Sequence, residues 1–171
     1  MALSSSSSPP TADLCDDHIK SPQRLQIVEP NLFKSFGKKK AFHGVIETVS
    51  CFESNPLVRE TLSSEGHGRV LVVDGGGSKR CAILGDMLAG FAKDNNWAGV
   101  VVNGYIRDSA VINEMEDVGI KALGTHPLKS AKTHPGSKGV SVNFGGVEFV
   151  PGHYLYSDED GIIISETDLM K

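Results

Sequence analysis

Residues 69–108, RVLVVDGGGSKRCAILGDMLAGFAKDNNWAGVVVNGYIRD, contain the elements that decide the fold. Residues 69–74 and 98–103 are continuous apolar runs, which are typical of parallel strands buried on both faces. Residues 80–84 are too short for a helix and predict a further strand. Residues 86–96 place apolar side chains at helical spacing. This alternation of strands and helices predicts an α/β fold.

The segments on either side extend the pattern. Residues 42–52 are rich in Val, Ile, Thr and aromatic residues and predict a strand. Asn55-Pro56 predicts the cap and first position of a helix, which Gly66 and Gly68 would end. Residues 109–118 predict the next helix.

The remaining elements are short. Residues 120–123 predict one more strand, and residues 12–20 a helix with Thr11 as its N-cap. Residues 31–40 look irregular. From residue 140 the pattern predicts two hairpins, one around Gly145-Gly146 and one around an acidic turn, with strands at 140–144, 147–150, 154–156 and 162–165.

Composition narrows the class of protein. The chain has 171 residues, enough for one domain with a core of its own, and we expect that domain to span residues 12–171. Residues 1–11 are rich in Ser and Pro and predict a disordered tail. A net charge of −4 disfavours a nucleic-acid surface. The basic run Lys38-Lys39-Lys40 is interpreted as a solvated turn, with a phosphate contact as the alternative.

Cellular location is inferred from two absences. No apolar run approaches the roughly 20 residues that span a membrane, and the first residues match no secretory or transit signal. Cys15, Cys51 and Cys81 lack the spacing of a zinc site and are interpreted as reduced thiols. Reduced thiols predict a cytoplasmic protein.

Several chemical motifs fail on their details. The run Gly75-Gly76-Gly77 after a strand lacks the spacing of a dinucleotide or P-loop motif and predicts a tight turn. The six histidines show no metal-ligand spacing, and no serine has a nucleophile-elbow context. No lysine is evident at a strand end.

The strongest candidate site combines two places in the chain. Gly85 and Asp86 begin the predicted helix at 86–96, while Arg107 and Asp108 follow the strand at 98–103 and a turn at Gly104. Helix-start N–H groups and a guanidinium suit a small carboxylate, and an aspartate suits a hard divalent cation. Together they suggest a 2-oxo acid held on a metal. A surface ion pair and a helix cap remain the alternatives for the two aspartates.

Residues 69–108, together with NFGGVEFVPGHYLYSDEDGIIIS at residues 143–165, resemble the RraA-like family in a plant-type form. That family contains regulators of ribonuclease E activity and class II 4-hydroxy-4-methyl-2-oxoglutarate aldolases. The resemblance covers nearly the whole folded chain and rests on several motifs in the same order. It implies a ββα swivelling domain in three layers, with C-terminal β-hairpins, that assembles as a homotrimer or a hexamer with sites between subunits.

The resemblance also implies roles for particular residues. The amides of Gly85 to Leu88, including Asp86 and Met87, and the Arg107 side chain would bind the pyruvyl carboxylate. Asp108 would bind Mg²⁺ or Mn²⁺, and Asp86 would hold water on that metal. A metal-dependent aldolase of this kind cleaves 4-hydroxy-2-oxo acids to pyruvate and also decarboxylates oxaloacetate, because both reactions pass through the same enolate.

The chain differs from the aldolase pattern in two places. The gap from Gly85 to Arg107 holds one residue more, and Val111 replaces an acid, so that the nearest acids are Glu114 and Glu116. An acid of a neighbouring subunit, such as Glu159, Asp160 or Glu166, is an open alternative. The alternative function is a non-catalytic regulator that binds a ribonuclease E-type endonuclease or an RNA helicase. Asp108 favours the enzyme, because regulators without aldolase activity typically replace it with a neutral residue.

Overall fold

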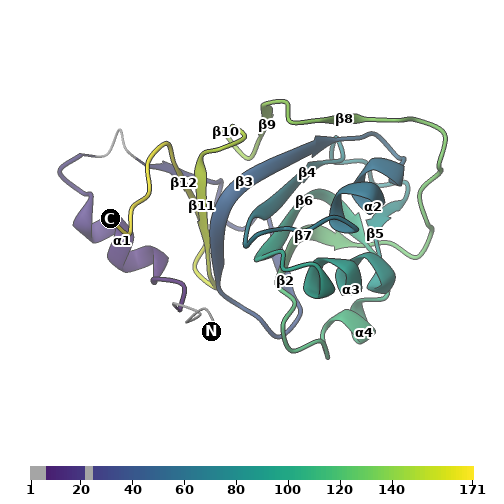
Figure 1. Ribbon diagram of the computed structural model, residues 1–171, viewed down its shortest axis with the longest axis horizontal. Coiled ribbons are helices and arrows are strands. Elements are labelled where there is room, and N and C mark those ends of the chain that lie inside the picture. The colour runs from purple at the N-terminus through teal and green to yellow at the C-terminus, as the bar shows by residue number, and fades with distance from the viewer. Residues whose placement is uncertain (1–6, 22–24) are drawn as a thin grey trace.

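The apolar runs of the sequence form the parallel half of one curled sheet (Figure 1). The computed structural model describes residues 7–21 and 25–171. In it β3 (Phe42–Ser50), β4 (Val70–Asp74), β6 (Gly99–Ile106) and β7 (Ile120–Thr125) are parallel neighbours in that order. All of β4 except Asp74 is buried, as expected of a strand that is covered on both faces.

Antiparallel strands complete the sheet at both edges. The short β5 (Ala82–Leu84) pairs parallel with the far end of β6, which matters for the site described below. The other strands are β2 (Lys34–Phe36) on β7, β8 (Ser137–Lys138) and β11 (Tyr154–Ser157) on β3, β12 (Ile162–Ser165) on β11, and β1 (Gln26–Ile27) on β12.

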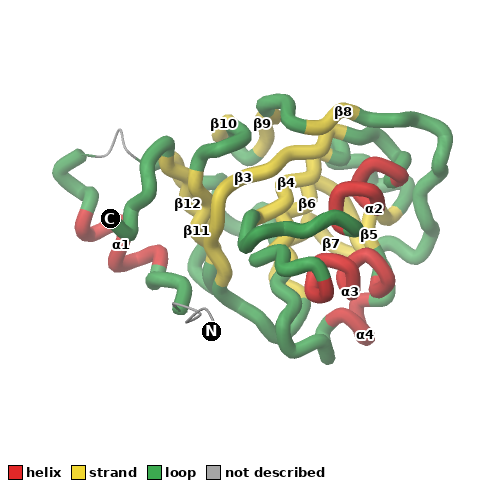
Figure 2. The backbone as a smooth tube through the Cα atoms, in the orientation of Figure 1, coloured by secondary structure: helices red, strands yellow, loops and turns green. Residues whose placement is uncertain are grey.

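The sheet separates two apolar cores. Alternate residues of β4 point to opposite faces, so that Leu71 and Val73 lie in one core and Val70 and Val72 in the other. The first core is covered by α2 (Pro56–Leu62), α3 (Asp86–Asp94) and α4 (Ser109–Ile112). The second is covered by the hairpin of β9 (Val142–Phe144) and β10 (Val147–Phe149) and by the curl of the sheet. Figure 2 shows the resulting layers, with the three helices grouped on one side.

A third, smaller cluster lies at the end of the curl. Helix α1 (Thr11–Asp17) packs Leu14 against Tyr156 and Ile163 of β11 and β12. The predicted helix therefore exists, but it begins one residue earlier than expected. Thr11 is buried, and its hydroxyl donates to Asp158 Oδ1 (2.8 Å) instead of capping the helix. The folded part thus includes Thr11, which was assigned to the tail, while residues 1–6 of that tail lie outside the described residues.

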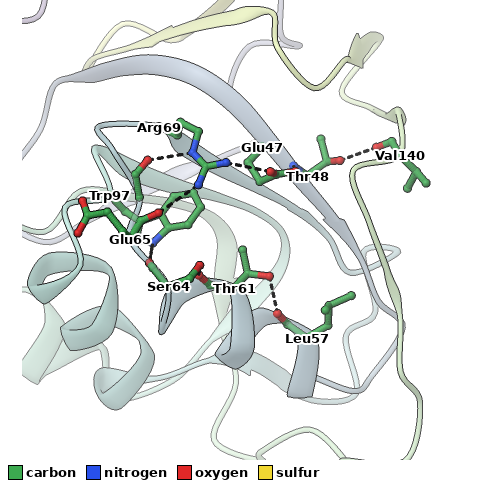
Figure 3. A network of polar contacts seen from close by, with 10 residues as sticks. Glu47, Thr48, Leu57, Thr61, Ser64, Glu65, Arg69, Trp97 and Val140 are labelled. Atoms are coloured by element: carbon green, nitrogen blue, oxygen red, sulfur yellow. Dashed lines mark hydrogen bonds and ion pairs between the residues drawn. The ribbon is translucent and has the colours of Figure 1, made fainter.

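A polar network fixes the amino ends of the central strands (Figure 3). The Arg69 guanidinium donates to Glu47 Oε2 (3.0 Å) and to the Gly66 carbonyl (2.9 Å), and lies 5.0 Å from the Trp97 ring centre. Trp97 Nε1 in turn donates to the Ser64 carbonyl (3.0 Å). These contacts tie the segments that lead into β4 and β6 to each other. The candidate site lies at the other, carboxyl ends of these strands, so its residues extend from strands whose positions are fixed.

All four predicted helices end earlier than expected, α1 at Asp17 instead of residue 20 and α3 at Asp94 instead of residue 96. Helix α2 stops at Leu62, before the glycines at 66 and 68, because the chain turns at Ser63. Asn55 occupies the cap position, but its side-chain amide donates to the Ile83 carbonyl (2.9 Å) and joins α2 to β5. Helix α4 has only four residues, whereas residues 109–118 were expected to be helical.

Strand β6 also differs from the prediction. Gly104 does not form a turn, and the strand continues to Ile106 because it has a partner on each side. Tyr105 pairs with Ala82 of β5 and with Gly124 of β7. Residues 31–40, expected to be irregular, contain the edge strand β2.

The remaining expectations about loops have simple outcomes. The turn at Gly75-Gly76-Gly77 is confirmed: Gly76 and Gly77 have φ of 66°, and a side chain at Gly75 would meet the Asn103 carbonyl. Lys38 and Lys40 are exposed, as expected of a solvated turn, whereas Lys39 is half-buried and its Nζ donates to the Ala98 carbonyl (2.8 Å). Within the described residues, no helix is long and apolar enough to cross a membrane.

Candidate functional site

The predicted site residues lie together around one hollow. It has a volume of about 210 Å³, small for a ligand site and suited to a small metabolite. The hollow lies where β5 and β6 end and α3 begins. All six residues singled out in the sequence line it: Gly85, Asp86, Met87, Leu88, Arg107 and Asp108.

The pairing of β5 with β6 brings these two segments together. The Arg107 N–H donates to the Leu84 carbonyl (2.9 Å), so the residues that follow each strand are neighbours. The Asp86 N–H then donates to Asp108 Oδ2 (3.3 Å). A Cβ atom on Gly85 would lie 2.6 Å from the same oxygen. Gly85 therefore has no side chain because the Asp108 carboxylate takes that space.

Asp108 has an unusual backbone conformation. Its φ of 58° and ψ of 33° are left-handed, a region that Asp and Asn enter more readily than most residues. This conformation ends β6, begins α4 and places the carboxylate beside α3. Strained backbone at such a position is more common at functional sites than elsewhere.

Arg107 and Asp108 form a loose ion pair. Arg107 Nε lies 3.7 Å from Asp108 Oδ2, and the two side chains are 39% and 37% exposed. A pair this exposed contributes at most about 1 kcal/mol to stability. Asp108 contacts the Nε atom of the guanidinium, so the two terminal NH₂ groups remain available to bind a ligand. A planar carboxylate fits that fork with two hydrogen bonds.

The start of α3 already holds carboxylate oxygens. Asp86 Oδ1 accepts from the Met87 N–H (2.8 Å), next to the contact between Asp108 and the Asp86 N–H. Side-chain oxygens thus occupy the positions that a bound anion would take. The Leu88 N–H has no protein acceptor among the described residues. Helix-start amides of this kind attract negative charge.

Besides Ala82 and Leu84 of β5, five polar residues that sequence reasoning did not find line the hollow. They are Asn55, Arg59, Lys129, Ser130 and Lys132. Three of them are cationic, and the two lysines lie in a loop and not at a strand end. Residues 128–132 have no periodic pattern and adjoin the site only because Ala82 of β5 forms an isolated parallel bridge with Lys129. No local signal in the sequence indicates such a bridge.

The residues present suit a divalent cation that keeps several water ligands better than one that is surrounded by protein ligands alone. Among the described residues, no three His, Cys, Asp or Glu side chains form a metal-binding group. Mg²⁺ often uses only one or two carboxylates and completes its shell with water and substrate oxygens. Asp108 and Asp86 supply such a pair in the lining of the hollow. The acids after Val111 do not join them, because Glu114 and Glu116 pair with Lys38 (3.4 and 2.9 Å).

Cysteine and histidine chemistry does not contribute. Cys51 and Cys81 are buried, although each lies just outside a strand, and burial raises the pKa of the Cys51 thiol to about 12. A thiol with so high a pKa is a poor nucleophile. No histidine lines the hollow. The chemistry of the site therefore belongs to carboxylates, cations, one hydroxyl and backbone amides.

Comparison with known proteins places the chain in a family. Residues 11–164 match the family model described as RraA-like: Aldolase/RraA. A protein of Aromatoleum aromaticum named "Putative 4-hydroxy-4-methyl-2-oxoglutarate aldolase" is 53% identical over 160 residues, which are 94% of this chain and 98% of that protein. The chain belongs to the RraA-like family.

Two solved structures are similar to the whole fold. One, titled S-adenosylmethionine: 2-dimethylmenaquinone methyltransferase from Geobacillus kaustophilus, has a TM-score of 0.87 and 47% identity, covering 95% of this chain and 98% of its own. The other, titled the RNA-processing inhibitor RraA from Thermus thermophilis, has a TM-score of 0.86 and 43% identity, covering 92% and 93%. These two names and the aldolase name accompany one fold. The fold alone therefore does not identify the function, which has to be inferred from the residues of the site.

The contact between Gly85 and Asp108 leads to a first prediction. Gly85→Ala should lower the free energy of unfolding in urea, because the new methyl group displaces the carboxylate. In a chain that carries Asp108→Gly the same change should cost less, by at least about 0.5 kcal/mol, because no carboxylate is present. Gly85 has an ordinary extended backbone (φ −130°), so backbone strain does not add to either value. If Gly85→Ala lowers the free energy of unfolding by the same amount in both chains, within about 0.3 kcal/mol, the contact is contradicted.

Proposed function

We propose that this chain is a divalent-metal-dependent class II pyruvate aldolase. It would cleave 4-hydroxy-2-oxo acids of the 4-hydroxy-4-methyl-2-oxoglutarate type to pyruvate, and would also decarboxylate oxaloacetate. The observation that carries the proposal is the meeting of Arg107, Asp108 and the first turn of α3 in one small hollow. The aldolase name of relatives about half identical over nearly the whole chain supports it.

The chain's own residues would bind and orient the substrate. The free NH₂ groups of Arg107 would donate to the substrate carboxylate, and the Leu88 amide, which has no protein acceptor among the described residues, would complete its binding. This fixes the neighbouring keto group toward Asp108. Holding the reacting carbons in one orientation is itself a large part of such catalysis.

Asp108 is the residue that would hold Mg²⁺ or Mn²⁺, with Asp86 beside it. When bound, the cation would act as a Lewis acid that stabilises the negative charge developing on the keto oxygen. In the aldol cleavage a proton leaves the 4-hydroxyl group, the bond between carbons 3 and 4 breaks, and its electron pair becomes part of pyruvate enolate. A proton then adds to carbon 3. Asp86 would hold a water molecule through which these protons move.

The regulator remains the second candidate function. It is supported by the similarity to the RNA-processing inhibitor of Thermus thermophilis and requires a partner such as a ribonuclease or an RNA helicase. The acidic residue at position 108 favours the enzyme. A pair of functions of this kind can be separated by measuring metal-dependent release of pyruvate.

Assembly and location follow as parts of the proposal. Met87, Val111 and Leu128 are each more than half exposed on the segments that surround the hollow. Apolar side chains in such a place support a homotrimer, or a hexamer, with the sites covered by neighbouring subunits. The three free cysteines support a reducing compartment, and hence the cytoplasm.

The metal requirement gives the direct test of the proposal. Because one or two carboxylates bind Mg²⁺ modestly, treatment with a chelator should abolish pyruvate release from oxaloacetate and from 4-hydroxy-4-methyl-2-oxoglutarate. Added Mg²⁺ or Mn²⁺ should restore it. The measurement is a coupled assay of pyruvate, with the spontaneous metal-catalysed rate subtracted. Full activity after exhaustive chelation would exclude the class II mechanism.

The carboxylate fork gives a second prediction. Arg107→Lys keeps the positive charge but loses the planar pair of donors, so the substrate is oriented less well. We expect kcat/KM to fall at least roughly 100-fold, about 3 kcal/mol of transition-state stabilisation. The same pyruvate assay measures it, and circular dichroism confirms folding. Near-wild-type kinetics in this variant would place the carboxylate elsewhere.

A further inference from the structure

The hollow carries more positive charge than one carboxylate requires. Four cationic side chains line it, Arg59, Arg107, Lys129 and Lys132, against the two carboxylates of Asp86 and Asp108. Asp108 lies beside Arg107. Among the described residues, the other three cations form no ion pair. A divalent cation at Asp108 would increase the excess further. A ligand with a single negative charge, taken up by Arg107, would leave this excess unmatched.

A buried hydroxyl in the same hollow also lacks a partner. Ser130 is only 5% exposed, and its Oγ has no hydrogen-bond partner among the described residues. Leaving a buried hydroxyl unpaired costs about 1–3 kcal/mol, so such groups are rare unless a ligand or water completes them. Because Ser130 lines the hollow between Lys129 and Lys132, a bound anion is the natural acceptor for its proton.

Strand β5 separates this group from Arg107. On one edge of β5 the Leu84 carbonyl accepts from the Arg107 N–H (2.9 Å). On the other edge Ala82 accepts from the Ser130 N–H (3.0 Å) and donates to the Leu128 carbonyl (2.7 Å). The two backbones are therefore two strand spacings apart, about 10 Å. A five-carbon diacid, with roughly 5 Å between its carboxyl carbons, and a hydrogen bond at each end cover about the same distance.

We propose that residues 128–132 bind the second carboxylate of a dicarboxylic 2-oxo acid. Lys129 and Lys132 supply the charge, and the Ser130 hydroxyl supplies a short, directed hydrogen bond. These three are specificity-determining residues, which select acids with a carboxylate at the far end over acids that end in a methyl group. The inference rests on the proposed function in one respect, that Arg107 takes the first carboxylate.

A pair of ligands that the enzyme cannot cleave tests this directly. 2-Oxoglutarate and 2-oxopentanoate have the same carbon chain and differ only in a terminal carboxylate or methyl group, and neither has a 4-hydroxyl group. With Mg²⁺ present, isothermal titration should give a Kd for 2-oxoglutarate at least about 10-fold lower than for 2-oxopentanoate. Equal values for the two ligands would overturn the proposal.

Variants assign the selectivity to residues 128–132. The double variant Lys129→Met/Lys132→Met should bring the ratio of the two Kd values close to one, and Ser130→Ala should reduce it about 3-fold or more. Both lysines are exposed, so their loss does not threaten the fold. Lys34→Met, an exposed lysine on edge strand β2, is the matched control and should leave the ratio unchanged. A ratio that survives in the double variant would overturn the assignment.

The outcome is separate from that of the proposed function. If the chain binds 2-oxoglutarate selectively but releases no pyruvate from 4-hydroxy-2-oxo acids, the carboxylate site at residues 128–132 stands and the proposed aldolase activity is wrong. If the chain releases pyruvate but binds both ligands equally, the proposed aldolase activity stands and the carboxylate site at residues 128–132 is wrong.

Discussion

The candidate site depends on one close approach, between the backbone of Gly85 and the carboxylate of Asp108. Parallel pairing of β5 with β6 brings the two residues together, and only glycine leaves room for the carboxylate oxygen. The left-handed backbone of Asp108 then directs that oxygen to the first amide of α3. The helix start, the guanidinium and the carboxylate thus meet because two strand ends are held in register.

The two halves of the site are supported differently. Arg107 and Asp108 directly follow a buried strand of the central sheet, and the network around Arg69 fixes the amino end of that strand. Residues 128–132 belong to a loop that touches the sheet at an isolated bridge. In the proposed site the catalytic groups would lie on a fixed frame and the specificity groups on an adjoining loop, an arrangement that is common in α/β folds. It would allow relatives to change substrate without moving the chemistry.

The sequence predicted the parallel strands, α3 and the C-terminal hairpins because their apolar spacing is strong and local. The predictions were wrong where contacts between residues far apart in the sequence determine the local structure. Gly104 lies within β6 because β5 and β7 pair on either side of it, and the Asn55 side chain bonds to Ile83 instead of its own helix. Position 85 could be found because glycine before a helix is a local signal. Ser130 could not, because its place in the site follows from the bridge at Ala82.

The measurement that tests the central claim most directly compares wild type with Asp108→Asn in decarboxylation of oxaloacetate at saturating Mg²⁺. Asn tolerates the left-handed backbone and keeps the size of the side chain, so the fold should survive while the negative charge is lost. Asp94→Asn, an exposed acid at the end of α3, is the matched control. The account predicts a metal-dependent wild-type rate, preserved in Asp94→Asn and reduced at least about 100-fold in Asp108→Asn. A wild-type rate no higher than the metal-only background, or equal rates in all three chains, would contradict it.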